Sequence, residues 1–302
     1  MRRGVTLFIT LSIIAAMLAL VGVVFHFLET ARAKAEVKAS LIQANLLYSD
    51  TKNALRRLLG KTPKTSTYTT FYNTPLPIAS TNGEFGVMVH CSPIASRPNI
   101  AWLALDGHPD RQAHFEIAQK VYDFLVDKAD LKNPTLLYDA LLDALKNSHR
   151  VRYNILSNIN KKKGTISYRE FQSILRTYRY EADDPAVLTL PWQTYFAFGT
   201  DLKRIDSNFI APEVLAVIFD IDLQLVKGED GFAMGSSLKD FLENNGLDTA
   251  WYTLQGPREV FVKQHPVDAM RCTVNYGFRD SQYAFRFDYI HKKVEGFEFL
   301  GH

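Results

Sequence analysis

The fold of this chain is decided largely by one stretch, VTLFITLSIIAAMLALVGVVFHFL, which runs from Val5 to Leu28. It contains no Asp, Glu, Lys or Arg, and the first acidic residue, Glu29, follows it directly. An α-helix rises about 1.5 Å per residue, so these residues can cross a hydrocarbon core of roughly 30 Å. Because the apolar part of a secretory signal peptide has only about 7–15 residues, the stretch predicts a membrane helix that the mature chain retains.

A short basic leader, MRRG at residues 1–4, precedes this stretch. A leader that ends in Gly directly before a long apolar helix resembles the leader of type IV pilin-like proteins. In such proteins a membrane peptidase cuts after the Gly, so the resemblance implies a cut after Gly4 and a mature chain that begins at Val5. Two alternatives remain. An uncleaved signal anchor also places Arg before its apolar span, and a signal peptide could be cut near residues 31–33.

The helical pattern continues beyond the apolar stretch. From Thr30 to Leu59 there is no Pro or Gly, and most residues favour helix. Gly60 and Pro63 then supply stop signals. The sequence therefore predicts one transmembrane and spine helix over 5–60, whose second half presents an apolar stripe to a globular domain. The residues of the predicted stripe are Val37, Leu41, Ala44, Tyr48, Leu55 and Leu58.

Ile9 is the fifth residue after Gly4, a position at which most pilin-like subunits carry Glu. In an apolar helix bundle a carboxylate is tolerated only when it is paired, and its partner in these proteins is the free amine of a neighbouring subunit. A subunit with no neighbour above it would leave such a Glu unpaired. Ile9 therefore indicates a position at the tip of a filament, although a simple lipid-facing residue would also be Ile.

Composition indicates a folded domain after the helix. Of 302 residues, roughly 240 follow the first sixty, enough for one large or two small domains. The net charge of +3 is too small to demand nucleic acid or an anionic surface as a partner. An aromatic content of 12% argues against long disorder. With only two cysteines, Cys91 and Cys272, a zinc site rich in Cys is excluded.

The pattern of strands and helices predicts an α+β fold, in which a pilin-type antiparallel sheet is split by a large inserted α-helical domain. The first part of the sheet is expected in 61–108, the insert in 109–250 and the completing strands in 251–302. Strands are predicted at 66–72, 84–91, 99–105, 259–263, 271–277, 282–291 and 296–299. Helices are predicted at 111–130, 134–145, 167–178, 212–221 and 236–245.

The most specific internal motif is IDSNFIAPEVLAVIF, residues 205–219. It resembles a segment of the K-type minor pseudopilins of type II secretion systems, the general secretion pathway protein K family. The residue pair Phe209-Ile210 departs from that pattern, which has a small polar residue there. The family also has a short basic leader, no Glu at the fifth mature position and a large helical insertion. The residues that match the family segment are Asn208, Ala211, Pro212, Val214 and Leu215.

This resemblance implies a structural function. A K-type subunit sits at the tip of a type II secretion filament, or a related pilus-like one, and helps to initiate its assembly. The implied partners are other minor pseudopilins, contacted through the N-terminal helix, together with the prepilin peptidase and the bacterial inner membrane. The globular domain would lie in the periplasm.

The residues of the motif also have a plain structural explanation. Asn208 or Ser207 can cap a helix, Pro212 suits its first turn, and the apolar residues after it form a buried face. A helix-hairpin-helix of DNA-binding proteins can begin similarly, but it requires a Gly-rich hairpin that holds a phosphate. Residues 220–224 here are acidic and lack Gly, so no nucleic acid partner is predicted.

Calcium is the one ion for which residues can be named. Residues 163–171 look like the second half of an EF-hand, but Ile159, Lys161 and Lys163 would occupy its first ligand positions, where calcium needs oxygen. Some K-type relatives carry calcium, and such a site here would use Asp220, Asp222, Glu229 and Asp230. Otherwise no cofactor and no metal is predicted.

No catalytic motif stands out. The chain has no HExxH, no G-x-S-x-G and no P-loop, so we predict that it is not an enzyme. The alternative to a pseudopilin is a periplasmic binding or sensor domain held by a single-pass anchor.

Cys91 and Cys272 are predicted to be neighbours. Both lie in strands assigned to the same sheet, on opposite sides of the insert, and an oxidising compartment would allow a bridge. Two separately buried thiols are the alternative.

Overall fold

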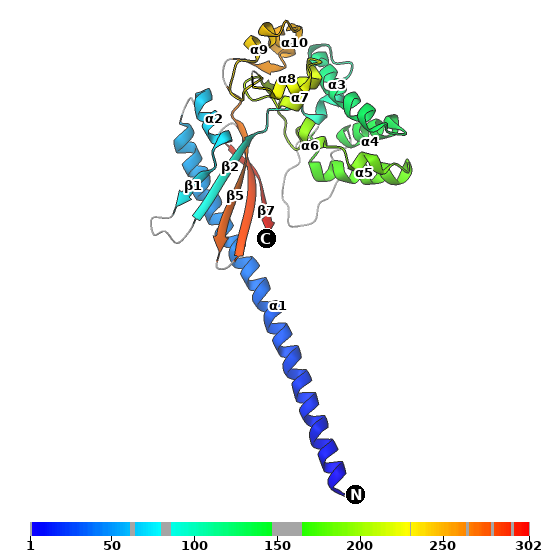
Figure 1. Ribbon diagram of the computed structural model, residues 1–302, viewed down its shortest axis with the longest axis vertical. Helices are drawn as coiled ribbons and strands as arrows, with labels where there is room; N and C mark the ends of the chain where they lie inside the picture. The colour runs from blue at the N-terminus through cyan, green and yellow to red at the C-terminus, as the bar shows by residue number, and fades with distance from the viewer. Residues whose placement is uncertain are drawn as a thin grey trace.

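The computed structural model describes residues 2–60, 64–79, 86–146, 165–229, 231–263, 266–278, 281–290 and 293–301. It has three parts, which follow one another along the long axis of the molecule (Figure 1). A single long helix begins at the N-terminus, an antiparallel sheet packs on the second half of this helix, and a group of helices lies at the far end. The α+β class predicted from the sequence is confirmed.

Helix α1, Arg2–Leu59, forms one continuous rod, as predicted. The first half projects away from the rest of the molecule (Figure 1). Within Ile13–Leu59 it contains a window with a mean hydropathy of 2.1, and none of that window is buried. This helix is therefore long and apolar enough to cross a membrane.

The second half of α1 packs on the sheet with a face that shares only Ala44, Tyr48 and Leu55 with the predicted stripe. Ala44 and Leu55 are buried as expected, but Val37 is 51% exposed and Leu58 is exposed as well. The buried face instead includes Ser40, which is fully buried. The reason is that a small side chain lets the helix approach the sheet closely, and the Tyr276 hydroxyl donates a 2.6 Å hydrogen bond to the Ser40 carbonyl oxygen. Thr51 and Leu59 complete the buried face.

The main sheet has five strands in the order β1-β2-β5-β6-β7, and each neighbouring pair is antiparallel. Since β2 and β5 are neighbours in the sheet but far apart in the sequence, the insert lies between them. It occupies 94–268, longer at both ends than the predicted 109–250. The strands are β1 Leu76–Ala79, β2 Gly86–Pro93, β5 Ala269–Phe278, β6 Ser281–Ile290 and β7 Lys293–Gly301.

Aromatic residues fill the layer between α1 and the sheet. Tyr48 of α1 meets the rings of Phe287 and Phe297 edge-on, with centroids 5.5 and 5.1 Å apart. Alternate residues of β6, including Phe285 and Phe287, are fully buried. Burying side chains of this size contributes about 2–3 kcal/mol each, so α1 and the sheet form one unit.

Residues 66–72 were predicted as a strand, and this prediction is wrong: they belong to helix α2, Thr65–Asn73. The many Thr and Tyr residues favour strand locally. However, Tyr68, Phe71 and Tyr72 have the spacing of one helical face and are buried together. Tertiary packing of this face outweighs the local preference.

The insert has its own core, which runs from Ile100 to Phe261. All five predicted helices are present, with ends shifted by a few residues. Its α-helices are α3 Gln112–Ala129, α4 Pro134–Lys146, α5 Tyr168–Glu181, α6 Trp192–Tyr195, α7 Pro212–Ile218, α8 Leu223–Lys227, α9 Leu238–Asn244 and α10 Ala250–Thr253. Its 3-10 helices are η1 Ile100–Leu105, η2 Pro109–Arg111, η3 Pro185–Leu188 and η4 Gly256–Arg258.

Two strands predicted near the ends of the insert differ from the expectation. Residues 99–105 form the 3-10 helix η1, because the Asn99 side chain accepts a hydrogen bond from the Ala101 N–H and donates one to the Thr200 carbonyl oxygen. In 259–263 only Phe261–Val262 is a strand, β4. It pairs in parallel with β3, Ile205–Asp206, and takes no part in the main sheet.

Candidate functional site

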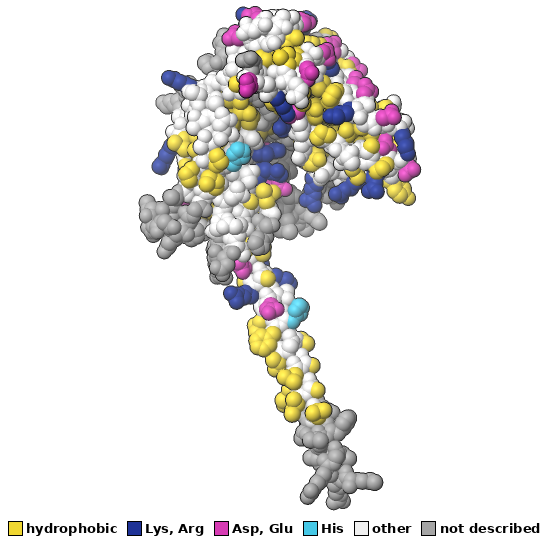
Figure 2. Space-filling model, in the orientation of Figure 1, with side chains coloured by type: hydrophobic (Ala, Val, Ile, Leu, Met, Phe, Trp, Pro, Cys, Tyr) yellow, Lys and Arg dark blue, Asp and Glu magenta, His cyan; other side chains and the backbone are white. Residues whose placement is uncertain are grey.

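The exposed half of α1 is the first candidate surface. Among the side chains that the structure describes, hydrophobic ones cover this part of the rod, and charged ones appear closer to the sheet (Figure 2). Leu18, Val23 and Phe27 are among the exposed ones. Gly4, Val5 and Ile9 belong to α1, and their side chains lie outside the described part of the structure.

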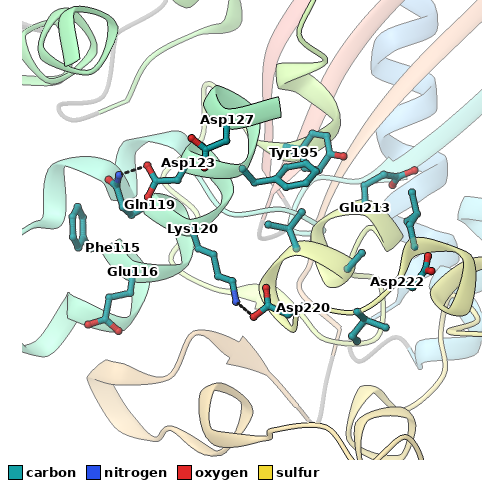
Figure 3. A pocket seen from close by; sticks show the side chains of 15 residues that line it. Phe115, Glu116, Gln119, Lys120, Asp123, Asp127, Tyr195, Glu213, Asp220 and Asp222 are labelled. Carbon is teal, nitrogen blue, oxygen red and sulfur yellow. Dashed lines mark hydrogen bonds and ion pairs between the residues drawn. The ribbon is translucent and has the colours of Figure 1, made fainter. Parts of the chain in front are cut away.

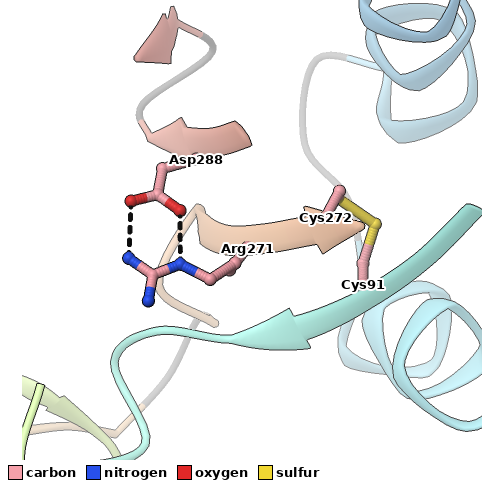
Figure 4. The surroundings of a disulfide bond; sticks show 4 residues. All are labelled: Cys91, Arg271, Cys272 and Asp288. Atoms are coloured by element: carbon pink, nitrogen blue, oxygen red, sulfur yellow. Dashed lines mark hydrogen bonds and ion pairs between the residues drawn. A yellow bond between two sulfur atoms is a disulfide. The ribbon is translucent and has the colours of Figure 1, made fainter. Parts of the chain in front are cut away.

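Cys91 and Cys272 are joined by a disulfide in the structure (Figure 4). They lie directly opposite each other in the β2–β5 register, with Cα atoms 4.0 Å apart, and both are buried. Beside them, Arg271 of β5 donates two hydrogen bonds, of 2.7 and 2.8 Å, to the Asp288 carboxylate of β6. Strands on both sides of the insert are thus cross-linked at the point where the insert leaves the sheet.

The segment 205–219 lies at the junction between the sheet and the insert. Pro212 is in the first turn of α7, and Val214 and Leu215 are fully buried, as the sequence suggested. The predicted caps are wrong. The residue before the helix is Ala211, which provides no side-chain cap. Its N–H donates to the Ser96 carbonyl oxygen, which anchors the start of α7 to the segment after β2.

Ser207 and Asn208 have roles other than capping. The Ser207 hydroxyl donates a 2.6 Å hydrogen bond to the Val262 carbonyl oxygen of β4. The carbonyl oxygen of Asn208 accepts one of 2.6 Å from the N–H of Gly235. Both residues therefore hold segments of the insert together.

Phe209 is the contact that sequence reasoning missed. Among the described residues, it is the one member of the insert that belongs to the core of the sheet unit. Its ring is fully buried and meets the rings of Tyr72 and Tyr68 of α2, with centroids 4.9 and 6.4 Å apart. The only sequence signal was the departure of Phe209-Ile210 from the family pattern.

Asp206 brings a buried carboxylate to the same junction. It is only 2% exposed. Its Oδ2 accepts a 2.6 Å hydrogen bond from the Val267 N–H, and its Oδ1 accepts one of 3.0 Å from the Asn208 N–H. Burial raises the pKa of this carboxyl to about 6, although these hydrogen bonds act in the opposite direction. Nearby Tyr72 has its pKa raised by burial and then by the Asp206 charge.

A groove of about 910 Å³ runs between α3 and α7 (Figure 3). Lys120 of α3 crosses it and forms a 2.5 Å ion pair with Asp220, which follows α7. Asp220 adopts a left-handed conformation with φ 54°, and the next N–H, that of Ile221, bonds back to the Ala216 carbonyl oxygen and ends α7. The ion pair therefore ties α3 to the end of α7.

Comparisons with known proteins find similarity only at the level of solved structures. No protein-family model and no curated protein matches the chain. A chain in the crystal structure of the GspK-GspI-GspJ complex from the type 2 secretion system of enterotoxigenic Escherichia coli is similar, with 12% identity and a TM-score of 0.49. The similarity covers 88% of this chain and 99% of that chain. At this identity and TM-score it does not by itself assign the chain to a family.

Two of the four calcium candidates, Asp220 and Asp222, line the groove, and each has a partner within the protein. The carboxylate of Asp220 binds Lys120, and that of Asp222 accepts a 2.8 Å hydrogen bond from the Gln224 N–H at the start of α8. Glu229 is exposed, and Asp230 lies outside the described residues. Within the described ranges, no group of three or more His, Cys, Asp or Glu side chains could hold a metal ion. Because Asp230 lies outside these ranges, calcium binding by the four residues stays a prediction of the sequence.

The EF-hand-like segment is described only in part. Ile159, Lys161 and Lys163 lie outside the described residues. Ser167 and Glu170 form a reciprocal capping box at the start of α5, so Glu170 serves the helix N-terminus.

Proposed function

We propose that this chain is a structural minor pseudopilin of the K type, at the tip of a type II secretion filament or a related pilus-like one. One observation carries the proposal. The first half of a single helix is apolar and exposed, while its second half packs on an antiparallel sheet that is interrupted by a helical insert. Such a subunit would have its α1 in the inner membrane and its sheet and insert in the periplasm.

The mechanism would be assembly. Before assembly the exposed side chains of α1 are covered by lipid, and within a filament they would be covered by the helices of other minor pseudopilins. Cleavage after Gly4 would leave the free amine of Val5. With Ile9 in place of Glu, the subunit has no carboxylate that requires an amine from a subunit above it. This supports a terminal position, and the insert would then cover the tip.

Mass spectrometry of the N-terminus tests the proposal directly. In cells with a prepilin peptidase, the purified full chain should begin at Val5, and Gly4→Ala should block this processing. The matched control is the wild-type chain from cells without the peptidase, which should begin at Met1. A wild-type chain that retains Met1 to Gly4 in both strains would overturn the proposal and favour an anchored binding or sensor domain.

The partners are tested separately. Other minor pseudopilins should co-purify with the chain from membranes in mild detergent, and removal of residues 5–28 should abolish the association. An association that survives this removal would contradict assembly through α1.

A further inference from the structure

The groove between α3 and α7 is strongly acidic, although the chain as a whole has a net charge of +3. Its lining contains one lysine, Lys120, and six carboxylates. Two of these are neutralised by ion pairs: Asp220 by Lys120, and Glu213 by Lys227 at 2.6 Å. The other four carboxylates, Glu116, Asp123, Asp127 and Asp222, form no ion pair within 4 Å among the described residues.

These carboxylates follow the groove and do not cluster at one point. Glu116, Asp123 and Asp127 lie on one exposed stripe of α3, and Asp222 lies on the opposite wall (Figure 3). A second hollow of about 460 Å³ also includes Glu116 and continues along α3 past Trp251 and Leu254, where Arg258 closes the acidic part of the surface. From Gln112 to Asp127, α3 extends for about 22 Å, which matches about seven residues of extended polypeptide.

The walls between the acidic groups are apolar. Phe124 of α3 exposes its ring, the largely buried ring of Tyr195 of α6 lies 5.5 Å behind it, and Val217 and Ile221 line the other wall. The amine of Lys128 lies over the Phe124 ring, 5.6 Å from its centroid. Aromatic faces beside carboxylates suit the ammonium groups and the hydrocarbon stems of basic side chains.

The groove already holds one group of this kind. The Lys120 amine lies between the Asp220 carboxylate and the Ile218 carbonyl oxygen, which it reaches at 3.0 Å. The negative charge of the groove disfavours the binding of nucleic acids and anionic lipids. Complementary charge and the length of the groove instead fit a segment of polypeptide.

We propose that the α3–α7 groove binds an extended segment of a partner protein in which Lys or Arg residues alternate with apolar residues. Its basic groups would pair with Glu116, Asp123, Asp127 and Asp222, and its apolar side chains would contact the wall formed by Phe124, Tyr195 and Val217. The groove lies in the insert, away from the exposed half of α1 (Figure 1), so this binding does not depend on the proposed role of α1.

The test uses the full chain in nanodiscs of zwitterionic lipid and a fluorescent eight-residue peptide, in which four lysines alternate with leucine and tryptophan. Fluorescence anisotropy should show binding that weakens as NaCl rises from about 50 to 300 mM. The double variant Asp123→Asn/Asp127→Asn should bind at least about tenfold more weakly. Both side chains are exposed, so this variant should keep the fold, which circular dichroism checks.

Two controls separate binding in the groove from a general effect of charge. The double variant Asp139→Asn/Asp240→Asn removes the same charge from exposed positions on α4 and α9, and it should bind the peptide as the wild type does. A peptide with glutamates in place of the lysines should not bind. The variant Phe124→Ala, which leaves every carboxylate in place, should weaken binding of the basic peptide severalfold.

Several results would overturn the proposal. They are no binding of the basic peptide to the wild type, equal binding of the acidic peptide, or an equal loss in the two double variants. A dimer of the chain in sedimentation experiments that only the groove variants abolish would identify a second copy as the occupant, which also contradicts the proposal.

Discussion

Phe209 of the insert packs edge-on against Tyr72 of α2, with ring centroids 4.9 Å apart and ring planes at 89°. The contact joins the insert to the unit formed by α1, α2 and the sheet, at a point away from the two places where the chain itself connects them, after β2 and before β5. Beside it, the buried Asp206 carboxylate accepts hydrogen bonds from the N–H groups of Asn208 and of Val267, which lies just before β5. The orientation of the insert relative to α1 is therefore set by packing as well as by the chain.

Truncation of Phe209 should loosen this junction. Phe209→Ala removes a fully buried ring and is expected to lower the free energy of unfolding by about 3–5 kcal/mol. Hydrogen exchange should then increase in α2, because its buried face loses its partner. The matched control is Phe171→Ala, an equally buried ring inside the core of the insert, which should increase exchange around α5 instead. Equal exchange in α2 for both variants would contradict this role.

The buried carboxyl of Asp206 should make the fold more stable in acid. Its pKa rises from an ordinary 3.8 to about 6 in the folded chain. The folded state therefore holds the proton more tightly, and this contribution to stability is present below pH 4 and lost as the pH rises through 6. The loss is about 3 kcal/mol. Denaturant unfolding at a series of pH values should show the wild type losing this amount relative to Asp206→Asn.

The control for this pH series is Asp240→Asn, an exposed aspartate on α9. Its stability curve should stay parallel to that of the wild type between pH 4 and pH 7. If the curve of Asp206→Asn were parallel as well, the carboxyl would not titrate in this window. The stability difference between the wild type and Asp206→Asn at any single pH also contains the altered hydrogen bonds to Val267 and Asn208. Only the change of this difference with pH reports the titration of the carboxyl.

A side chain at Gly235 should destabilise the fold. Its φ is +90°, and a Cβ there would lie 2.5 Å from the Thr69 hydroxyl oxygen of α2. Gly235→Ala therefore combines an unfavourable backbone conformation with a clash at the junction. Gly246→Ala is the matched control, since its φ of +63° is also positive but no atom lies within 4 Å of the new Cβ. We expect a loss of about 1 kcal/mol for Gly246→Ala and at least about 1–2 kcal/mol more for Gly235→Ala, measured by thermal unfolding.

The disulfide should stabilise the chain mainly through the loop that it closes. Cys91 and Cys272 are 181 residues apart, so the bridge restricts a large part of the unfolded chain. Loss of the bridge in Cys91→Ala/Cys272→Ala is expected to cost about 3–5 kcal/mol. A reducing agent should destabilise the wild type and leave the double variant unchanged. Free thiols in the unreduced, denatured wild type would show that the bridge does not form in the cell.

Sequence patterns predicted the correct element where the residue types and their spacing favour the same secondary structure. The long apolar run predicts α1, and strands rich in aromatic and β-branched residues on both sides of a helical stretch predict a split sheet. They failed at α2, where Thr and Tyr favour strand but Tyr68, Phe71 and Tyr72 bury one helical face. They also misplaced part of the buried face of α1, because Ser40 is polar by residue type and yet small enough to be buried against the sheet.

The candidate surfaces were less accessible to sequence reasoning because their residues are distant in the chain. Phe209 and Tyr72 are separated by 137 positions, and no local pattern links a Phe after β3 to a Tyr in α2. The groove is likewise formed by segments that are distant in the chain, since α3 supplies one wall and residues from Glu213 onward supply the other. Asp220 and Asp222 stood out as acidic, but the ion pair of Asp220 with Lys120 across the groove depends on the packing of α3 against α7.

The tip position is tested through Ile9. In a bundle of apolar helices, Ile9→Glu introduces a carboxylate that costs about 2–4 kcal/mol unless it is paired or protonated. If the subunit sits at the end of the filament, no amine lies above position 9. The variant should then be processed normally. In a strain that lacks the wild-type copy, fewer partner pseudopilins should co-purify with it and less protein should be secreted. Thr10→Glu, which places the same carboxylate one residue further along α1, is the matched control and should impair assembly to a similar degree. If Ile9→Glu instead assembled and secreted as well as the wild type while Thr10→Glu failed, a neighbouring amine would be pairing with position 9. The subunit would then occupy the shaft of the filament, and the proposed tip position would be wrong.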